Sequence, residues 1–469
     1  MALASTVIAE APDALWTRHY GGDNQDWGYW VEETSDSGFV AAGFAYDKDG
    51  GDTDDDMYVV RTDRDGILLW DSTYGGDRTD RAVQIMQTSD SGFMLCGNSR
   101  SYAEGYDDIR VLKLDPTGET VWGENYGLQY TADLAGGFCQ LLDGSFLIAA
   151  HSADGLYMLK IDPSGGILNE VFIDAIQQDV NAIAATSDSG AIVITWGSPL
   201  ILIKVNASGD TVWSNPYGSG SQGTSVIELA EGGYAAFGWR EYPLLDDEFY
   251  LVRVDADGGV VWEQHYGNEF RDHGFCVRET LDGGFVMVGT MFPPSGSEWE
   301  QVWVVRTDSD GDTLWTGAFG GDGTEMGNCI QLTSDSGYII TGVTSSYGAH
   351  DNELYLVRLG PDPALLSGVD DRDAGSLPAF NLSQNYPNPF NPATVIEFEL
   401  PRRSNVRITV INLLGQKVTE LVNQEYPAGR HRVTWDGLAA TGNRVASGIY
   451  YYRLQADDFT ETKKMLLLK

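Results

Sequence analysis

The feature that most constrains this chain is a segment that recurs seven times over its first three quarters. Each copy contains W-x-x-x-Y-G-G, then T-x-D-x-G-F, then an apolar run ending in Gly, and then V-V-R-x-D-x-x-G. Six copies keep the tryptophan, at Trp16, Trp70, Trp122, Trp213, Trp262 and Trp315. The acid of the T-x-D-x-G turn marks all seven copies, 43 to 54 residues apart, at Asp36, Asp90, Asp143, Asp188, Glu231, Asp282 and Asp335. A period of this length predicts an array of similar structural units.

Each copy predicts four short β-strands. Stretches such as YVVRTD and ILLW are rich in β-branched and aromatic residues and are joined by D-x-x-G turns, and T-S-D-S-G segments form the other tight turns. Seven units of four antiparallel strands resemble the WD-type and kelch-type β-propellers. A solenoid of sheets is the alternative, although helical patterning is absent. The sequence therefore predicts an all-β chain with a seven-bladed β-propeller over residues 14–360.

The order of the strands indicates how the ring closes. The tight hairpin in YVVRTDRDGILLW puts the tryptophan strand last in each blade, so the first tryptophan strand precedes blade one. The last copy, in turn, stops near Gly360 without such a strand. We infer that residues 14–20 complete the blade built from 325–360, which joins the ends of the ring and removes an exposed edge.

Three columns that repeat in the blades are interpreted as structural. Tryptophan and tyrosine four residues apart on the last strand share a face and should pack between blades. A glycine column on the second strand, including Gly43 and Gly97, indicates close backbone approach. A basic residue on the third strand should pair with the turn acid, and a ring of cations lining a channel is the alternative. The basic column is Arg61, Lys113, Lys160, Lys204, Arg253, Arg306 and Arg358.

Strand order also separates the two faces of the ring. The short turns fall on one face, and the Y-G-G loops and the variable loops between second and third strands fall on the other, which we call the loop face. Variable loops that carry aromatic residues on a rigid scaffold are expected to bind ligands, although each ring could instead cap a blade. The candidate ligand-binding residues are Tyr46, Tyr102, Tyr106, Trp196, Trp239, Tyr242, Trp299, Tyr347 and His350.

The same loops are acidic, and carboxylate clusters suit a hard cation such as calcium. Asp52, Asp54 and Asp56 are the candidate ligands. They are followed by Met57 where an EF-hand needs glycine, so an irregular calcium site is favoured over an EF-hand-like one. No other cofactor is indicated.

The sequence contains no motif that requires an enzyme. The six histidines show no H-E-x-x-H spacing, and no G-x-S-x-G elbow is present. The T-x-D-x-G turn resembles half of the Asp-box of sialidase-type propellers, where the box is a structural element far from catalysis. A glycoside hydrolase or lyase on the loop face stays an alternative.

Charge restricts the partners. The 469 residues carry 69 Asp+Glu and 29 Lys+Arg, a net charge of −40, which argues against nucleic acid and anionic membranes. No stretch is apolar enough to span a bilayer. Residues 1–13 resemble the end of a signal peptide and are expected to be a residual export segment. The four cysteines show no metal-ligand spacing, so we expect buried free thiols.

The last ninety residues differ from the rest. From residue 378 the chain has 11 Lys+Arg and 8 Asp+Glu, which leaves −43 for the preceding part. After a linker over 361–380, strand-like runs predict a small β-sandwich over 381–469. NYPNPFNPATVIEFELP, VINLLGQKV, VTWDG, VASGIYYYRL and the terminal TKKMLLLK resemble the type A C-terminal sorting domain of type IX secretion cargo. The motif positions are Asn388, Pro389, Phe390, Asn391, Pro392, Gly415, Trp435, Asp436, Gly437, Lys463 and Lys464.

That resemblance implies an Ig-like fold, contact with the type IX secretion machinery, and location outside the outer membrane of a Gram-negative bacterium. Together with the repeats, it leads us to expect an exported, cell-surface or released β-propeller whose loop face binds an extracellular glycan or protein. A carbohydrate-active enzyme and a self-associating matrix or appendage component are the alternatives.

Overall fold

The computed structural model describes the chain in two units, Met1–Leu365 and Leu366–Lys469, which are treated separately. Residues outside the description are 1–9, 23, 47–53, 103–105, 129–130, 242–246, 269, 293–298, 348–351, 367–379, 383–384, 386–393, 403, 413–415, 427–428, 436, 440–443, 447, 457–458 and 468–469. Apart from the short helix α1 (Pro363–Leu366), every regular element among the described residues is a β-strand, which confirms the predicted all-β class.

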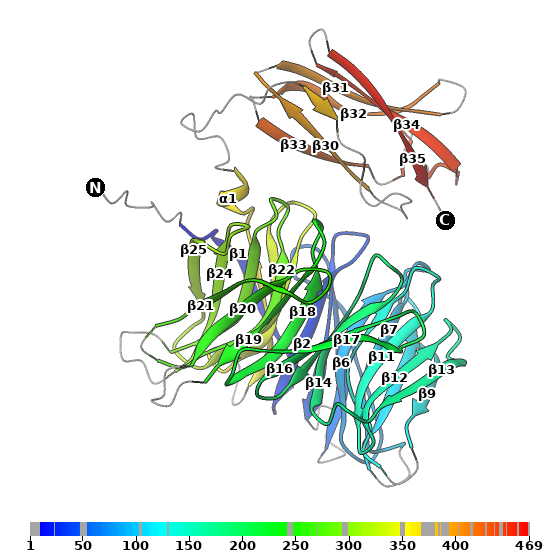
Figure 1. Cartoon of the computed structure of the whole chain (residues 1–469), viewed down its shortest axis with the longest axis vertical. Helices are drawn as coiled ribbons and strands as arrows, with labels where there is room; N and C mark the ends of the chain where they lie inside the picture. The colour runs from blue at the N-terminus through cyan, green and yellow to red at the C-terminus, as the bar shows by residue number, and fades with distance from the viewer. Residues whose placement is uncertain are drawn as a thin grey trace. The chain divides into compact units, whose positions relative to one another are not determined.

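Seven four-stranded antiparallel sheets make up the first unit (Figure 1). Blades 1 to 3 are β2 (Asp26–Glu33), β3 (Phe39–Tyr46), β4 (Asp55–Thr62) and β5 (Leu68–Tyr74); β6 (Asp80–Gln87), β7 (Phe93–Ser99), β8 (Asp108–Leu114) and β9 (Thr120–Tyr126); and β10 (Leu134–Gln140), β11 (Phe146–Ser152), β12 (Gly155–Ile161) and β13 (Ile167–Ile173). Blades 4 and 5 are β14 (Asp179–Ala185), β15 (Ala191–Trp196), β16 (Leu200–Val205) and β17 (Thr211–Tyr217); and β18 (Ser221–Glu228), β19 (Tyr234–Arg240), β20 (Glu248–Val254) and β21 (Val260–Tyr266). Blades 6 and 7 are β22 (Asp272–Glu279), β23 (Phe285–Met291), β24 (Gln301–Thr307) and β25 (Thr313–Phe319); and β26 (Glu325–Leu332), β27 (Tyr338–Thr344), β28 (Glu353–Leu359) and β1 (Ala14–Tyr20).

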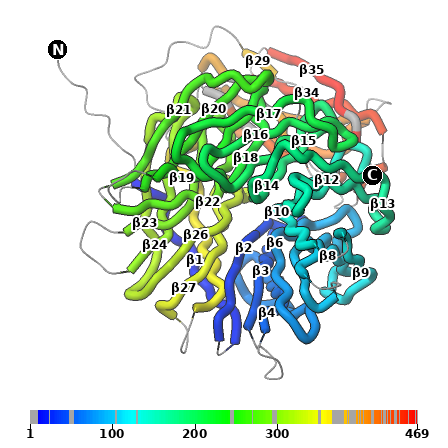
Figure 2. Tube along the Cα trace, turned by 60° about the horizontal axis from the view of Figure 1, so that its bottom comes forward, coloured from blue at the N-terminus to red at the C-terminus, as the bar shows by residue number. Residues whose placement is uncertain are grey.

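The blades form a seven-bladed β-propeller. The first strands of the blades, β2, β6, β10, β14, β18, β22 and β26, surround its centre (Figure 2). The two middle strands of each sheet are buried, as in β28, where every residue is buried. The outermost strands are exposed on one side, as in β5. The hydrophobic core therefore lies between neighbouring blades, where sheets pack face to face.

Blade 7 contains both ends of the ring. Strand β1 pairs antiparallel with β28, with Trp16 opposite Arg358 and Tyr20 opposite Leu354. The backbone N–H of Gly360 also donates to the carbonyl oxygen of Asp13 over 2.9 Å. The edge of β28 is thereby covered by the start of the chain.

The basic column forms the expected structural ion pairs. In all seven blades the third-strand cation lies 2.5 to 3.5 Å from the turn acid of its own blade. In blade 6, for example, the guanidinium of the fully buried Arg306 binds both oxygens of Asp282 at 2.7 Å. The interpretation of these cations as a channel lining is wrong, because each is turned toward the short turns of its own blade.

The aromatic column connects neighbouring blades, as expected. The indole Nε1 of Trp70 donates to the carbonyl oxygen of Pro116 in the next blade at 3.2 Å, and its ring lies edge-on against Phe93. The hydroxyl of Tyr74 donates to the carbonyl oxygen of Gly118 in the same turn at 2.6 Å. In blade 3, which has lost its tryptophan, the side-chain amide of Asn169 donates to the carbonyl oxygen of Ser208 at 2.7 Å. The polar contact between blades is thus kept without the aromatic ring.

Blade 6 uses a different partner for its tryptophan. The carboxylate of Asp362, which follows blade 7, is fully buried and accepts a hydrogen bond from Nε1 of Trp315 at 2.8 Å. It also accepts from Nε of Arg306 at 2.7 Å and from the hydroxyl of Tyr338 at 2.6 Å. The short helix α1 (Pro363–Leu366) begins directly after it. Asp362 therefore anchors the end of the propeller chain between blades 6 and 7.

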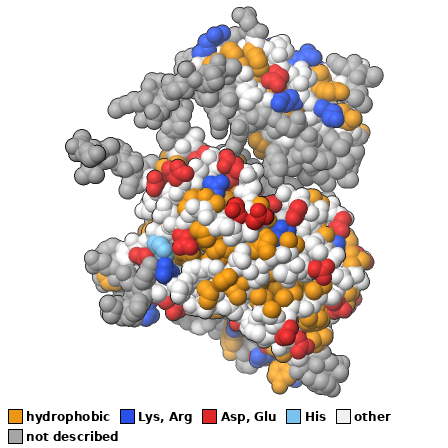
Figure 3. All heavy atoms as spheres, in the orientation of Figure 1, with side chains coloured by type: hydrophobic (Ala, Val, Ile, Leu, Met, Phe, Trp, Pro, Cys, Tyr) orange, Lys and Arg blue, Asp and Glu red, His pale blue; other side chains and the backbone are white. Residues whose placement is uncertain are grey.

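The second unit is an Ig-like β-sandwich. One sheet contains β29 (Asn381–Leu382), β30 (Thr394–Leu400) and β33 (Gly429–Trp435); the other contains β32 (Lys417–Tyr426), β31 (Ser404–Asn412), β34 (Gly448–Ala456) and β35 (Phe459–Leu467). Alternate residues of both sheets, such as Phe398 and Tyr452, are buried in one core. Lys and Arg side chains are visible on this unit, whereas Asp and Glu are widespread on the propeller face in Figure 3.

The described sorting-motif residues lie on two strands and in one turn of this sandwich. Trp435 is buried, and its Nε1 donates to the carbonyl oxygen of Leu438 at 2.9 Å. Gly437 has a φ of 73°, which favours glycine in the turn after β33. Lys463 and Lys464 lie on the edge strand β35. Asn388, Pro389, Phe390, Asn391, Pro392, Gly415 and Asp436 lie outside the described residues.

Within the described part of both units, no helix has the length and apolar character to cross a membrane.

Candidate ligand-binding site in the central channel

Each innermost strand contains one β-bulge at the same position. In blade 1 the pairing with β3 shifts between Gly28 and Trp30, which leaves Tyr29 as the extra residue. The same shift occurs in the other six blades. The bulged residues are Tyr29, Val83, Gly136, Asn181, Thr224, Phe275 and Asn328, and we call them the bulge ring. A bulge redirects a side chain and is frequent next to functional sites.

The glycine column on the second strand accommodates the bulges of five blades, whereas blades 3 and 4 have Ala150 and Thr195 at this position. A Cβ atom at Gly43 would lie 1.7 Å from the carbonyl oxygen of Trp27, directly before the bulge. At Gly97 the corresponding distance to the carbonyl oxygen of Arg81 is 2.2 Å, and at Gly342 the distance to that of Met326 is 1.7 Å. No side chain fits at such distances, so the backbone of the bulged strand occupies the space that a Cβ would need.

All seven residues of the bulge ring line one cavity. It runs along the central channel, has a volume of about 390 Å³, and is walled by the innermost strands together with Trp196 from the end of β15. Because the bulge ring differs from blade to blade, the wall is asymmetric although the scaffold repeats. Such a concave site with a few polar groups on a rigid scaffold is the usual place for a ligand.

Aromatic rings surround the loop-face end of this cavity. Trp27, Tyr29, Trp196 and Phe275 line it, and they come from blades 1, 4 and 6. Trp196 is 37% exposed and meets Trp239 edge-on, with ring centroids 4.7 Å apart. We call the four lining rings the aromatic mouth; they offer apolar faces to a ligand.

The buried Trp239 supports the aromatic mouth from behind. Its ring lies 5.7 Å from that of Phe275 and 4.8 Å from that of His273. The Nε2 atom of His273 is in turn 3.0 Å from the Asp247 carboxylate. These contacts hold Trp196 and Phe275 in place without Trp239 itself reaching the cavity.

The polar members of the bulge ring connect consecutive blades. The side-chain amide of Asn181 donates to the carbonyl oxygen of Gly223 at 2.8 Å, and the hydroxyl of Thr224 donates to that of Gly274 at 2.9 Å. These bonds fix the side chains against the channel wall. These bonds do not use the amide oxygen of Asn181 or the acceptor lone pairs of the Thr224 hydroxyl. These acceptors suit hydrogen bonding to a polar ligand.

A cation and a carboxylate lie deeper in the channel. The guanidinium of Arg278 lies over the ring of Trp30, 5.1 Å from its centroid, and its Nε donates to Gln331 at 2.8 Å. Burial raises the pKa of Glu32 to about 7, against the opposing effect of a hydrogen bond from the Gln87 backbone and the charge of Arg278. Arg278 therefore lines the cavity as a cation, and burial disfavours ionisation of the nearby Glu32.

Of the ligand-binding candidates predicted from the sequence, the structure places two at this site. Trp196 lines the cavity, and Trp239 lies behind it. The other candidates that the structure describes lie apart from it. Tyr347 is exposed and stacks between His19 and Tyr355 on blade 7. Tyr46 is half-buried at the end of β3, and Tyr106 and Trp299 are exposed. Tyr242 and His350 lie outside the described residues.

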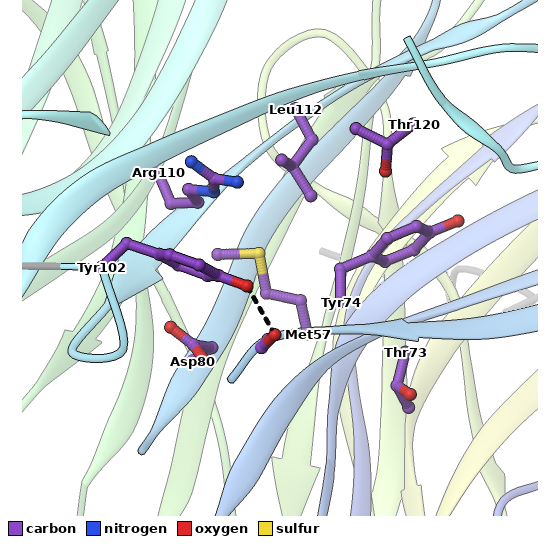
Figure 4. Close-up of a pocket in the computed structure, with 9 residues that line it drawn as sticks. Met57, Thr73, Tyr74, Asp80, Tyr102, Arg110, Leu112 and Thr120 are labelled. Carbon is purple, nitrogen blue, oxygen red and sulfur yellow. Dashed lines mark hydrogen bonds between the residues drawn. The ribbon is translucent and has the colours of Figure 1, made fainter. Parts of the chain in front are cut away.

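Tyr102 lines a second, smaller cavity of about 240 Å³ between blades 1 and 2 (Figure 4). Its hydroxyl donates to the carbonyl oxygen of Gly75 at 2.7 Å, and the Arg110 guanidinium lies 4.4 Å from its ring centroid. Asp80 and Met57 complete the polar and apolar sides. The ring of Tyr102 is thus held by its own neighbours and closes this cavity.

The candidate calcium ligands are only partly described. Asp54 and Asp56 are half-buried at the start of β4, and Asp52 lies outside the described residues. Among the side chains that the structure places, no group of three or more His, Cys, Asp or Glu is arranged to hold a metal ion. Calcium binding stays a prediction.

Sequence reasoning missed Trp27, Tyr29 and Phe275, because it selected loops and not the innermost strands. A usable signal was present. In five blades the glycine column lies opposite the residue that precedes the bulge, and the bulged residue itself varies between blades. A variable position inside a repeated strand indicates a site by the same logic that identified the variable loops.

Comparison with known proteins found one family model and several solved structures that are similar to parts of this chain. The family model for the FlgD Ig-like domain matches residues 389–458. The WD40 β-propeller domain of Doa1 is similar at 11% identity and a TM-score of 0.49, over 75% of this chain and 97% of that one. A protein of unknown function from Dyadobacter fermentans is similar at 11% identity and a TM-score of 0.44, over 75% and 99%. One from Bacteroides caccae, also of unknown function, is similar at 14% identity and a TM-score of 0.36, over 54% and 83%. No curated protein matches.

The chain is therefore a repeat protein of the seven-bladed β-propeller class. Its C-terminal unit is an Ig-like β-sandwich that is similar to the FlgD Ig-like domain over residues 389–458.

Proposed function

We propose that this chain is an exported β-propeller that binds an extracellular ligand, with a glycan favoured over a protein, at the aromatic mouth of its channel. The observation that carries the proposal is the convergence of Trp27, Tyr29, Trp196 and Phe275 on one cavity. Three different blades supply these rings. At the bulge position the other five blades carry Val83, Gly136, Asn181, Thr224 and Asn328, so the repeat does not require an aromatic ring there.

The chemistry of the cavity favours a sugar. The C–H face of a pyranose ring packs well against an aromatic face, and its hydroxyls need hydrogen-bonding partners nearby. Asn181, Thr224 and Asn328 supply such groups on the wall. A cavity of about 390 Å³ accommodates one or two sugar units and leaves a longer chain to extend over the loop face. A protein partner would instead need a broad, flat contact.

An oligosaccharide array, followed by calorimetric titration of the best-bound oligosaccharide, tests this proposal. Trp196→Ala should weaken binding at least about tenfold, because a buried aromatic contact contributes on the order of 1–3 kcal/mol. Trp299→Ala is the matched control, since Trp299 is exposed but does not line the cavity. Absence of any bound oligosaccharide, or equal loss in both variants, would contradict glycan binding at the mouth.

Hydrolysis is the alternative from another class. Glycoside cleavage needs two converging carboxyl groups, and the described residues that line the channel cavity include neither Asp nor Glu. Reducing-end release from the oligosaccharides of the array separates the two functions. Binding without release supports the proposal, and turnover by the wild-type chain would replace it with an enzyme.

We also propose that residues 381–469 direct export through the type IX secretion machinery. Support comes from the motifs quoted above, from their order along the chain, and from the Ig-like fold of the unit that contains them. Deletion of residues 381–469 should leave the propeller in the periplasm. The double variant Lys463→Ala/Lys464→Ala separates signal from fold, because both side chains lie on an edge strand outside the core. Undiminished surface display of the deletion variant would refute the assignment.

Calcium binding and self-association are proposed only as properties of the loop face. A melting temperature that is the same with calcium and with chelator would contradict calcium binding, including binding by Asp52, Asp54 and Asp56. A monomer by light scattering at all concentrations would remove a matrix or appendage role that depends on self-association.

A further inference from the structure

Two of the four cysteines lie side by side in the channel wall. Cys276 on β22 and Cys329 on β26 have their Sγ atoms 3.8 Å apart. Each directly follows the bulge of its blade, Phe275 in blade 6 and Asn328 in blade 7. They therefore occupy the same position in consecutive blades, and their closeness follows from the regular spacing of the innermost strands.

This thiol pair is reachable from the channel, although both residues are almost fully buried. Cys276 is among the residues that line the cavity, and Cys329 lies directly behind it. The other two cysteines differ in this respect. Cys96 and Cys139 are buried in separate hydrophobic clusters, and burial raises the pKa of each thiol to about 12. They are unreactive structural thiols and serve as internal controls.

The surroundings of the pair favour a thiolate. The Nη2 atom of Arg278 lies 3.9 Å from Sγ of Cys329, and the side-chain amide of Gln331 lies at the same distance. Burial opposes ionisation, but hydrogen bonding between the thiols and the charge of Arg278 together hold the pKa of Cys276 below that of an ordinary cysteine. The pKa of Cys329 is raised by burial and by its neighbour, so it keeps its proton while Cys276 is ionised.

We propose that Cys276 and Cys329 are a redox modification site that forms a disulfide between blades 6 and 7. The oxidant is a small disulfide that enters the channel. The Cys276 thiolate attacks one of its sulfurs, forms a mixed disulfide and releases one thiolate. Cys329 then loses its proton, attacks the Cys276 sulfur and releases the second thiol. Both cysteines are oxidised, the small disulfide is reduced to two thiols, and the sulfurs move from 3.8 Å to about 2.05 Å apart.

The bond would add a second covalent link between two blades that are otherwise joined by the chain segment 320–324 and by non-covalent contacts. It would close a loop of about fifty residues between the innermost strands and restrict the opening of the ring next to blade 7, which contains both chain ends. We expect the oxidised protein to melt a few degrees higher than the reduced protein. This inference does not depend on the proposed ligand.

The experiment uses the full chain and hydroxyethyl disulfide, a small neutral disulfide. After incubation and denaturation, the number of free thiols should fall from four to two. Trypsin should then release residues 272–278 joined to residues 307–358, which contain Cys276 and Cys329 respectively. The double variant Cys96→Ser/Cys139→Ser should form the same bond. Arg278→Gln should slow its formation several-fold.

Cys276→Ser is the matched negative variant, since serine keeps the size of the side chain. It should keep three free thiols and show no joined peptide. Four remaining thiols in the wild-type chain, or modification at Cys96 or Cys139 in place of the pair, would overturn the proposal. If the joined peptide forms but the melting temperature does not change, the disulfide site is supported. The claim that the bond restricts opening of the ring would then be wrong.

Discussion

The side-chain amide of Asn328 in the last blade donates a hydrogen bond to the carbonyl oxygen of Gly28 in the first blade, over 2.8 Å. The two residues are 300 positions apart in the sequence. Asn181 makes the equivalent bond to Gly223 between blades 4 and 5, also at 2.8 Å. The junction between blades 7 and 1, which we call the closing seam, therefore has the same contact as the junction between blades 4 and 5.

This equivalence predicts equal costs for two substitutions. Asn328→Asp and Asn181→Asp each replace the donor with a carboxylate that faces a carbonyl oxygen. Each should lower the free energy of unfolding by about 1–3 kcal/mol. Chemical denaturation of both variants provides the measurement. If Asn181→Asp were neutral while Asn328→Asp was costly, the closing seam would be weaker than the other blade junctions.

The second prediction concerns the first strand. A chain that starts at Glu10 should be as stable as the full chain, whereas removal of residues up to Tyr20 should cost on the order of 5 kcal/mol. The larger deletion exposes β28 and removes the buried hydroxyl contact from Tyr20 to the carbonyl oxygen of Gly66 at 2.6 Å. Melting curves of the two variants decide the matter. Equal melting temperatures would show that β1 is dispensable for closure.

The third prediction concerns Asp362. Asp362→Ala leaves the buried guanidinium of Arg306 and the donors of Trp315 and Tyr338 without this acceptor. We expect a loss of about 3–5 kcal/mol in the free energy of unfolding, because a buried charge loses one partner. Asp65→Ala, on an exposed turn, is the control and should change stability by less than about 0.5 kcal/mol. A small loss in Asp362→Ala would mean that Asp282 alone satisfies Arg306.

The fourth prediction is a loss of stability in acid. Burial alone would raise the pKa of the turn acid Asp36, but the hydroxyl of Thr34 and the charge of Arg61 together lower it. The hydroxyl of Ser145 and the ammonium of Lys160 lower the pKa of Asp143 to about 2. Since these values lie below the unfolded value of about 3.9, the carboxylates stabilise the fold above pH 4. The melting temperature should fall as the pH drops from about 4 to about 2.

Asp282→Asn isolates one of these pairs. The variant should be less stable than the wild type at pH 6, and the difference should shrink as the pH falls, because the wild-type carboxylate then becomes neutral as well. A constant difference across this range would show that the charge of Asp282 is unimportant.

The fifth prediction has the opposite sign. Burial raises the pKa of Glu32 to about 7, so its neutral form is favoured in the folded chain. Stability from this group is fully present below the unfolded value of about 4.3 and is lost as the pH rises through about 7. Between these limits the wild type should lose stability relative to Glu32→Gln, in melting curves recorded at several pH values. A parallel pH dependence of both proteins would contradict the raised pKa.

Much of the propeller could be predicted because its contacts repeat. Trp70, Asp90 and Lys113 have counterparts in the other blades, with Asn169 in place of the tryptophan in blade 3 and Glu231 in place of the aspartate in blade 5. A contact that nearly every blade makes leaves a column in the sequence. The site could not be predicted in the same way. Trp196 and Tyr29 are far apart in the chain and line one cavity only because the closed ring directs blades 4 and 1 toward the same channel.

The sequence by itself determined the number of blades, the four strands in each and the ion pair that each blade contains, because these depend on local periodicity and on contacts between adjacent units. Tertiary structure alone decided which side chains face the channel. The bulges turn one residue per blade inward, and ring closure places Asn328 beside Gly28. The same spacing of blades put Cys276 beside Cys329. No single segment specifies such neighbours, since each arises from the geometry of the closed ring.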